Sequence, residues 1–194
     1  MDAELLIPDG LVAGVDEAGR GPLAGPVVAG AVILDPHNPI EGLQDSKRLS
    51  AAKREVLYQE IQEKALAWAV ARADVGEIDR INILQASLLS MAMAVKNLQP
   101  CPDYLLIDGI FSIASDLPQK PIPKGDSLSI SIAAASIIAK VTRDRLMQKY
   151  HHYYPQFDFP RHKGYPTKAH KEAIRKFGFC PIHRKSFKGV KEYT

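Results

Sequence analysis

Apolar residues along the chain alternate between short runs and helical spacings, which is typical of a mixed α/β domain. Short apolar runs predict strands at residues 11–15, 27–34, 66–73 and 104–107. Apolar spacings of three and four predict helices at residues 50–65, 83–98, 127–150 and 167–177, with Ser50 as an N-cap and Gly178 as a stop. Residues 118–123 hold three prolines, so we expect a loop there.

The order of these elements predicts a mixed sheet that is covered by helices on both faces. Residues 1–150 would hold this sheet, and residues 151–194 would form a basic helical part that extends it without being an independent domain. The length of 194 residues suits one domain. With 46% hydrophobic and 24% charged residues, the composition is that of a folded globular chain.

The chain lacks the signals of an exported or membrane protein. No apolar run approaches the roughly 18 residues that cross a bilayer. Asp2 and Glu4 stand where a signal peptide would be basic. Cys101 and Cys180 lie far apart, with no metal-binding or paired spacing. We therefore expect a reduced, cytoplasmic protein that does not bind membranes.

Charge is distributed unevenly along the chain. From residue 140 onward there are 14 Lys and Arg residues against 4 Asp and Glu, whereas the whole chain has 25 against 22. An acidic first part and a basic last part suit a protein that holds cations in a pocket and also binds a polyanion. The alternative interpretation is a solvated basic tail without a ligand.

Four acidic residues stand at the ends of predicted elements: Asp16, Glu17, Asp108 and Asp126. Each has a local explanation, as a solvated strand end, a turn residue or a helix N-cap. As a group, they form the oxygen ligand set that Mg²⁺ or Mn²⁺ prefers, and two such ions can activate water for displacement at phosphorus. Neighbours in a strand point to opposite faces, so the pattern leaves open how Asp16 and Glu17 both reach one site.

A glycine-rich turn follows Glu17. Gly19, Gly21 and Gly25 differ from a dinucleotide-binding loop in their spacing, and a strand rather than a helix comes next. Glycines allow a ligand to approach the backbone closely. With Arg20 beside the carboxylates, the turn suits a sugar or phosphate.

Several blocks of residues resemble bacterial type 2 ribonucleases H (ribonuclease HII) in the order of that family. They are the run of residues 16–26, the Asp-Ser-Lys-Arg-Leu-Ser block at 45–50, Asp108-Gly109, Lys124-Gly125-Asp126 with the helix at 131–144, and the blocks at 162–167 and 183–187. The resemblance extends from about residue 14 to residue 187. It implies a ribonuclease H-like fold, a five-stranded mixed sheet flanked by helices with a small C-terminal helical extension.

The resemblance also implies an activity. The family's enzymes are metal-dependent endonucleases that hydrolyse the RNA strand of RNA–DNA hybrids and cut 5′ to single ribonucleotides embedded in duplex DNA. The products carry 3′-hydroxyl and 5′-phosphate ends, and the role is the removal of ribonucleotides and RNA primers in DNA replication and repair. Mg²⁺ or Mn²⁺ would be the cofactor, with two ions when substrate is bound.

By the same resemblance, Asp16, Glu17, Asp108 and Asp126 are the catalytic and metal-binding residues. Gly19, Arg20 and Gly21 would contact the ribose 2′-hydroxyl. Tyr165 would pack on the sugar of the following deoxynucleotide, and Lys47 would contact phosphate. We expect the duplex backbone to meet a basic set: Lys163, Lys168, Lys171, Arg175, Lys176, Arg184 and Lys185.

The expected partners are RNA–DNA hybrids and DNA duplexes that contain ribonucleotides, and we expect a monomer. The chain shows no clear sliding-clamp motif, which leaves docking to a clamp open. Two other functions compete with this interpretation. A metal-free ribonuclease could use histidines such as His170 and His183, which are otherwise structural or phosphate contacts, as acid and base. A non-catalytic nucleic-acid-binding module would use the carboxylates only as caps and solvated ends.

Overall fold

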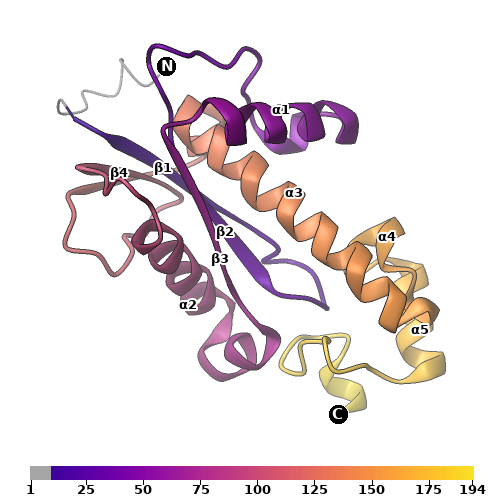
Figure 1. The fold of residues 1–194 in the computed structure, drawn as a ribbon. Helices are drawn as coiled ribbons and strands as arrows, with labels where there is room; N and C mark the ends of the chain where they lie inside the picture. Colours follow the sequence, from indigo (N-terminus) through magenta and orange to yellow (C-terminus); the bar gives the residue numbers. More distant parts are fainter. Residues whose placement is uncertain (1–9) are drawn as a thin grey trace.

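A five-stranded mixed sheet forms the centre of the protein in a computed structural model that describes residues 10–194 (Figure 1). Its strands are β1 (Val12–Ala18), β2 (Val27–Ile33), β3 (Ala67–Ala73), β4 (Tyr104–Asp108) and β5 (Gln119–Ile122), in the order β3-β2-β1-β4-β5. β1 pairs antiparallel with β2 and parallel with β4; β2–β3 is antiparallel and β4–β5 parallel. The predicted fold class is confirmed.

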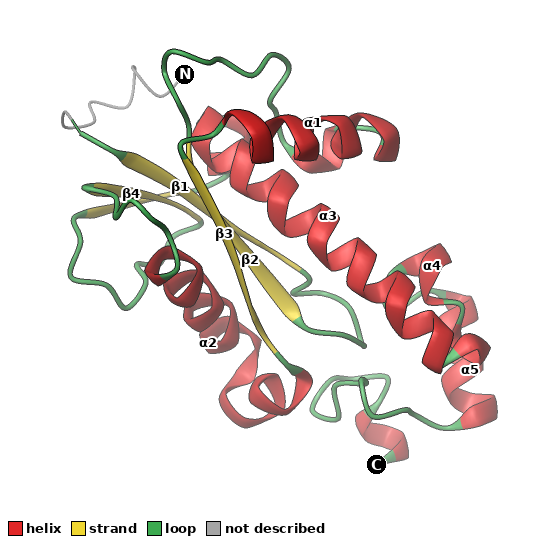
Figure 2. Cartoon of the chain, viewed as in Figure 1, coloured by secondary structure: helices red, strands yellow, loops and turns green. Residues whose placement is uncertain are grey.

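Helices cover both faces of this sheet (Figure 2). α2 (Val75–Lys96) packs on one face, and α3 (Ile130–Tyr153) with α1 (Ala51–Lys64) packs on the other. On the α2 face, Val15 and Leu105 share an apolar cluster with Met91. Alternate residues of the strands face α3, so the central strands are apolar on both sides.

Glycines let α3 lie unusually close to the sheet. A Cβ on Gly14 would lie 2.0 Å from the backbone carbon of Ser131, and one on Gly30 would lie 2.6 Å from the carbonyl oxygen of Ala135. Only glycine fits at these two positions, because the helix backbone occupies the space of a side chain. The result is a fixed contact of α3 with the middle of β1 and β2.

The structure corrects the predicted loop at residues 118–123. Residues 119–122 form the edge strand β5, and Pro121 lies within it. Proline cannot donate a hydrogen bond to a ladder, but an edge strand has one side without a partner strand. The proline-rich segment therefore forms the outermost strand of the sheet, next to β4, and is not a loop.

Two helix boundaries also differ from the prediction. The long helix begins at Ile130, with Ser129 as its N-cap, and not at residue 127, because residues 125–127 form a separate 3₁₀ turn. α2 begins at Val75, eight residues before the predicted start at residue 83. It contains a break at Asn82 (φ 68°), whose Oδ1 accepts from the N–H groups of Leu84 and Gln85. The predicted helix is thus the second half of α2, with Asn82 as its own cap.

Among the described residues, α2 is the one helix that is long and apolar enough to cross a membrane. Its apolar side packs on the sheet through Met91, Ala94 and Val95, and its first turns carry Glu77 and Arg80. Burial against the sheet therefore accounts for its composition.

The chain after α3 packs back on the sheet end. It contains α4 (Phe159–His162) and α5 (Lys168–Phe177), and 3₁₀ turns at Pro155–Phe157 and Lys191–Tyr193; a further such turn, Ser46–Arg48, precedes α1. Phe157 and Phe159 stack on each other and share an apolar cluster with Leu23, Ala24 and Met147. Gly25 and Leu23 also make backbone hydrogen bonds to Ile182 and Gly164. The C-terminal part is thereby fixed to the glycine-rich turn.

Candidate active site

Parallel strands bring three of the predicted carboxylates to one edge of the sheet. Asp16 and Glu17 lie near the end of β1, and Asp108 is the last residue of the adjacent parallel strand β4. All three line a cleft of about 250 Å³. Asp126 lies in the 3₁₀ turn after β5, and its carboxylate is 3.1 Å from Nζ of Lys47, which also lines the cleft.

Asp16 and Glu17 both line the cleft although they are neighbours in a regular strand. β1 stays regular through Ala18, with Asp16 opposite Gly30 and Glu17 opposite Ala29. Gly30 contacts α3 and Ala29 belongs to the cluster under α2, so the two carboxylates lie on opposite faces of the sheet edge. The N–H of Glu17 donates to Oδ1 of Asp16 at 2.6 Å, which fixes the Asp16 side chain.

Backbone and lysine contacts hold the other two carboxylates. The N–H of Gly125 donates to Oδ1 of Asp108 at 2.7 Å, which joins the end of β4 to the turn that carries Asp126. Lys47 lies in the Ser46–Arg48 turn, where Asp45 accepts from its N–H, and its ammonium reaches Asp126. Burial lowers the pKa of Lys47, but the hydrogen bond and the negative charge of Asp126 and the charge of Asp16 together raise it above its usual value, so the lysine is positively charged.

Negative charge is concentrated at this edge. Burial, and then the neighbouring charges of Glu17 and Asp108, raise the pKa of Asp16 well above its usual value. Burial and Asp126 likewise raise the pKa of Asp108. Burial raises the pKa of Glu17, although the guanidinium of Arg20 at 3.6 Å opposes this. The positive charges of Arg20 and Lys47 therefore do not balance the negative charges of the carboxylates.

The donor set fits divalent cations of the Mg²⁺ and Mn²⁺ type, because it consists of carboxylate oxygens. Within residues 10–194, no three His, Cys, Asp or Glu side chains are arranged to hold one ion among themselves. Mg²⁺ usually takes one or two carboxylates and completes its shell with water and phosphate oxygens. The observed spread of carboxylates matches that mode, and the raised pKa values show an uncompensated charge that cations would satisfy.

Two buried arginines hold the glycine-rich turn from behind. Arg184 donates to the carbonyl oxygens of Gly19, Arg20 and Gly25. Arg143 of α3 donates to those of Ala24, Pro26 and Lys163. The prediction that Arg184 contacts the duplex backbone is therefore wrong, since its side chain is fully buried and its donors are used inside the protein.

Tyr165 lies against the same turn. Its ring carbon would be 3.5 Å from a Cβ on Gly21, and the side chain is 42% exposed in the wall of the cleft. Arg143 connects the turn of Tyr165 to the glycine-rich turn through Lys163. The structure thus brings together all the predicted site residues: the carboxylates, residues 19–21, Lys47 and Tyr165.

His170 and His183 lie in the protein interior. Nε2 of His170 and Nε2 of His183 are 3.0 Å apart, and Nδ1 of His170 contacts the carbonyl oxygen of Tyr165. Burial lowers the pKa of each to about 4. Neither lines the carboxylate cleft. His170 and His183 are therefore structural and do not supply the acid–base pair that a metal-free ribonuclease needs.

Sequence reasoning missed some residues of the cleft wall, namely Ser46, Ser136, Lys140 and Arg143. Ser46 and Ser136 are hydrogen-bonded to each other at 2.6 Å, and Lys140 pairs with Asp144 at 2.7 Å. Three of these residues lie on one side of α3, at positions 136, 140 and 143, a helical spacing that marks this face.

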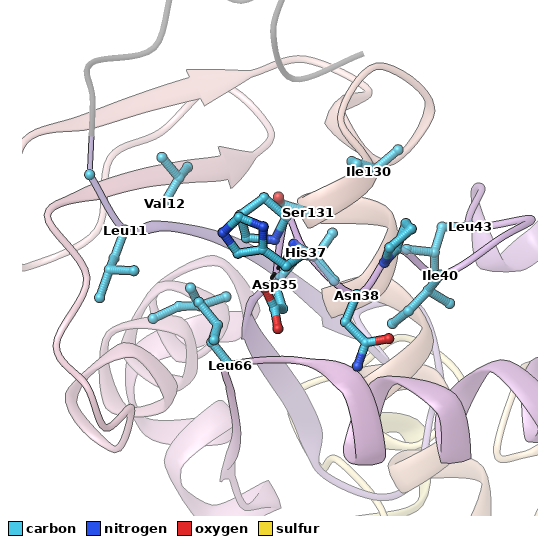
Figure 3. Close-up of a pocket in the computed structure, with 15 residues that line it drawn as sticks. Leu11, Val12, Asp35, His37, Asn38, Ile40, Leu43, Leu66, Ile130 and Ser131 are labelled. Atoms are coloured by element: carbon cyan, nitrogen blue, oxygen red, sulfur yellow. Dashed lines mark hydrogen bonds between the residues drawn. The ribbon is translucent and has the colours of Figure 1, made fainter.

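A larger cavity, of about 540 Å³, lies at the other end of the sheet (Figure 3). The start of β1 and the end of β2 form its walls, with apolar side chains such as Leu11, Leu66 and Ile130. Its polar groups include Asp35, which accepts from the N–H of His37 at 2.9 Å. No cluster of carboxylates lines this cavity, so the chemistry belongs to the opposite edge.

Comparisons with known proteins agree with this site. A family model described as Ribonuclease HII matches residues 13–190. Ribonuclease HII of Geobacter metallireducens (strain ATCC 53774 / DSM 7210 / GS-15) is 62% identical over 183 residues, which are 94% of this chain and 86% of that protein.

Solved structures show the same fold. Ribonuclease H2 from Pyrococcus horikoshii OT3 has a TM-score of 0.78 and 30% identity, covering 94% of this chain and 96% of that chain. RNase HII of Archaeoglobus fulgidus, solved in a complex with PCNA, has a TM-score of 0.75 and 25% identity, covering 92% and 95%. Bst-RNase HIII, solved with Mn²⁺, has a TM-score of 0.74 and 20% identity, covering 98% and 71%, which is a likeness of fold alone.

Proposed function

The chain belongs to the ribonuclease HII family, and from this premise we propose that the carboxylate cluster at the sheet edge is its catalytic, metal-binding centre. Ribonuclease HII is an endonuclease that cleaves RNA in RNA–DNA hybrids and at ribonucleotides embedded in DNA. The proposed centre consists of Asp16, Glu17, Asp108 and Asp126. We further propose that the enzyme removes ribonucleotides and RNA primers from DNA.

The observation that carries this proposal is the meeting of Asp16, Glu17 and Asp108 in one cleft with raised pKa values, with Asp126 held beside the cleft by Lys47. The family acts with divalent metals, and for this chain we propose Mg²⁺ or Mn²⁺, two ions with substrate bound. When bound, the ions supply an activated water and stabilise the leaving oxygen. Asp16 and Glu17 approach from opposite faces of the sheet edge, so the chain offers ligands on both sides of a phosphate.

Residues 19–21 would recognise the ribose. The carbonyl groups of Gly19 and Arg20 point to Arg184. The C=O and N–H of a trans peptide point in opposite directions, so the N–H groups of Arg20 and Gly21 point away from Arg184, and both residues line the cleft. These donors suit a 2′-hydroxyl, the group that distinguishes RNA from DNA.

Tyr165 would recognise the junction on the 3′ side of the ribonucleotide. Its ring is exposed in the cleft wall beside Gly21, where it can pack on the sugar of the following deoxynucleotide. With the 2′-hydroxyl at residues 19–21 and the next sugar at Tyr165, the phosphate at the carboxylates is the one 5′ to the ribonucleotide. Cleavage there leaves 3′-hydroxyl and 5′-phosphate ends.

The basic part after residue 150 would complete the nucleic-acid groove. Lys168, Lys171 and Arg175 of α5 are exposed and lie close to one helix face. Lys47 would contact a phosphate near Asp126. Phosphate contacts of this kind position a duplex without reading its sequence. Residues 1–150 would form the catalytic domain that this part extends.

For partners and location, we propose a monomeric, intracellular enzyme of the cytoplasm. The Archaeoglobus fulgidus relative was solved with PCNA. Docking of this chain to a sliding clamp is a separate question, which binding of the purified clamp to the purified enzyme would test.

The direct test uses a DNA duplex with one embedded ribonucleotide, labelled at its 5′ end, in Mg²⁺, Mn²⁺ or EDTA, with an all-DNA duplex as control. We expect a metal-dependent cut 5′ to the ribonucleotide, a 3′-hydroxyl end, and no cut in all-DNA. A cut that persists in EDTA and leaves a cyclic phosphate would contradict the proposed centre. Binding without any cut would contradict it equally and would support a binding module.

A further inference from the structure

A second groove lies against the other side of the same carboxylates. It has a volume of about 290 Å³ and shares Glu17, Arg20 and Asp108 with the catalytic cleft. Its far wall is apolar, formed by α2 at Leu88 and by the turn after β4 at Phe111. Asp16 and Tyr165 line the cleft but not this groove. The two hollows are therefore adjacent, and Glu17, Arg20 and Asp108 form the wall that they share.

The turn after β4 exposes apolar surface beside charged groups. Ile110 is 68% exposed and Phe111 is 46% exposed, and both line the groove. Neighbouring exposed apolar side chains next to a polar site mark a contact surface for a ligand. Lys124 lies at the same groove, exposed, with its backbone held at φ 58° in the turn before Asp126. An apolar wall with cations at its edge suits a sugar face with a phosphate beside it.

We propose that this groove binds the nucleotide directly 5′ to the cleaved bond, with its sugar on Phe111 and its own 5′-phosphate at Lys124. The proposal rests on the proposed function, because that function sets the direction of the strand. Residues 19–21 and Tyr165 take the ribonucleotide and the deoxynucleotide on the 3′ side. The strand must leave the carboxylates on the other side, where this groove borders the cleft and shares Glu17 and Asp108 with it.

The phosphate contact is tested by combining a protein change with a substrate change. The substrate is the single-ribonucleotide duplex, either unmodified or with a neutral methylphosphonate at the linkage one nucleotide 5′ to the scissile phosphate. We expect Lys124→Ala to lower kcat/KM about fivefold on the unmodified duplex, the scale of one exposed charge contact. On the methylphosphonate duplex the same change has little further effect, because the contact is already absent.

The matched substrate control carries the methylphosphonate two linkages 3′ to the cleaved bond. On this duplex, Lys124→Ala should still lower kcat/KM about fivefold. Independent effects of Lys124→Ala and the upstream methylphosphonate would overturn the proposal. If Lys124→Ala instead lost its effect only on the duplex with the 3′ methylphosphonate, the proposal would also be overturned. The groove would then bind the nucleotides on the 3′ side of the cleaved bond.

The sugar contact is tested with Phe111→Ala and Phe111→Leu. We expect Phe111→Ala to lower kcat/KM about tenfold, the scale of one lost stacking contact, and the apolar Phe111→Leu to retain most of the activity. Val56→Ala, an exposed apolar side chain on α1 at the opposite face of the sheet, is the control and should cut like the wild type. Thermal unfolding of each variant checks that the fold is intact.

The outcomes separate the two proposals. If the wild type makes no metal-dependent cut, the proposed function fails. If the wild type cuts as expected and Phe111→Ala, well folded, cuts equally fast, the groove proposal alone fails.

Discussion

At the scale of single residues, the carboxylates of Asp16, Glu17 and Asp108 repel one another, and this repulsion opposes folding. Asp16 is only 4% exposed and lies near Glu17 and Asp108, both of which raise its pKa. A buried carboxylate without a cation destabilises the native state, because its ionised form is disfavoured there. The clustered carboxylates therefore lower the free energy of unfolding of the metal-free protein, and their placement is explained by metal binding.

Asp16→Asn should stabilise the metal-free protein at neutral pH. The native pKa of Asp16 lies above its unfolded value, so its ionisation lowers stability as pH rises through that interval and above it. Asparagine keeps the acceptor for the N–H of Glu17. We expect a gain in the free energy of unfolding at pH 7.5 and none below about pH 3.5, where the carboxyl is largely protonated in both states. Urea unfolding in EDTA measures this; a loss at pH 7.5, or an equal gain at both pH values, would contradict it.

The sequence predicts those site residues that are carboxylates at the ends of predicted strands. Asp16, Glu17 and Asp108 stand directly at strand ends, so their positions follow from the strands. The sequence places Arg184 wrongly, because composition and charge cannot distinguish an arginine on the surface from one whose donors are all used inside the protein. Its partners, Gly19 and Gly25, lie more than 150 residues away in the chain.

Arg184→Ala should destabilise the protein and weaken cleavage. The change leaves the carbonyl groups of Gly19, Arg20 and Gly25 without their donor, and each unsatisfied buried group costs about 1–3 kcal/mol. We expect a loss of about 3 kcal/mol or more in urea unfolding. The adjacent Lys185→Ala, at an exposed side chain, is the control for stability and should unfold near the same urea concentration as the wild type. Equal stability of the two variants would refute the supporting role of Arg184.

At the scale of elements, the contact of α3 with the central strands positions the catalytic edge. Gly14 and Gly30 face α3 at distances that exclude a side chain. The sequence predicts these elements from their periodicity, but it does not show how closely they approach. The same limit applies to β5, which pairs with β4 although Pro121 lies within it. Its pairing depends on the edge position, which is a property of the whole sheet.

Gly14→Ala should be strongly destabilising, whereas Gly76→Ala should not. The new Cβ at residue 14 would lie 2.0 Å from the backbone of Ser131, so α3 has to shift, at an overpacking cost of about 3 kcal/mol. At Gly76, in the first turn of α2, nothing lies within 4 Å. Alanine there should be neutral or stabilising by up to about 1 kcal/mol. Thermal and urea unfolding of both variants measure the difference, and similar stabilities would contradict the close packing.

At the scale of the whole molecule, the acidic and basic parts of the chain are joined by a buried core of aromatic residues and histidines. Phe157 and Phe159 pack edge-on or tilted against His170 and His183. Sequence analysis predicts the charge division and the basic C-terminal part. It does not predict that the histidines are interior, because a histidine in a basic segment also suits a phosphate contact.

His170 and His183 should remain neutral in the folded protein down to about pH 5, since burial lowers the pKa of each to about 4. In the unfolded chain they take up protons below about pH 6.5. Their contribution to stability is therefore lost as pH falls from 6.5 towards 4, by roughly 2 kcal/mol for each at pH 5. NMR titration of the imidazole resonances tests this directly; a midpoint at pH 6 or above would contradict the buried cluster.

The measurement that tests the central claim most directly compares cleavage and binding by Asp108→Asn. Asparagine can still accept from the N–H of Gly125, so the turn that carries Asp126 keeps its place while one negative charge is removed. We predict a loss of cleavage by at least about 1000-fold in single-turnover assays with Mg²⁺, the scale of removing a group that stabilises the transition state. Affinity for the ribonucleotide-containing duplex should stay within about twofold, because phosphate contacts elsewhere carry the binding. Cleavage at the wild-type rate, or an equal loss of binding and cleavage, would contradict a catalytic role for the carboxylates at the sheet edge.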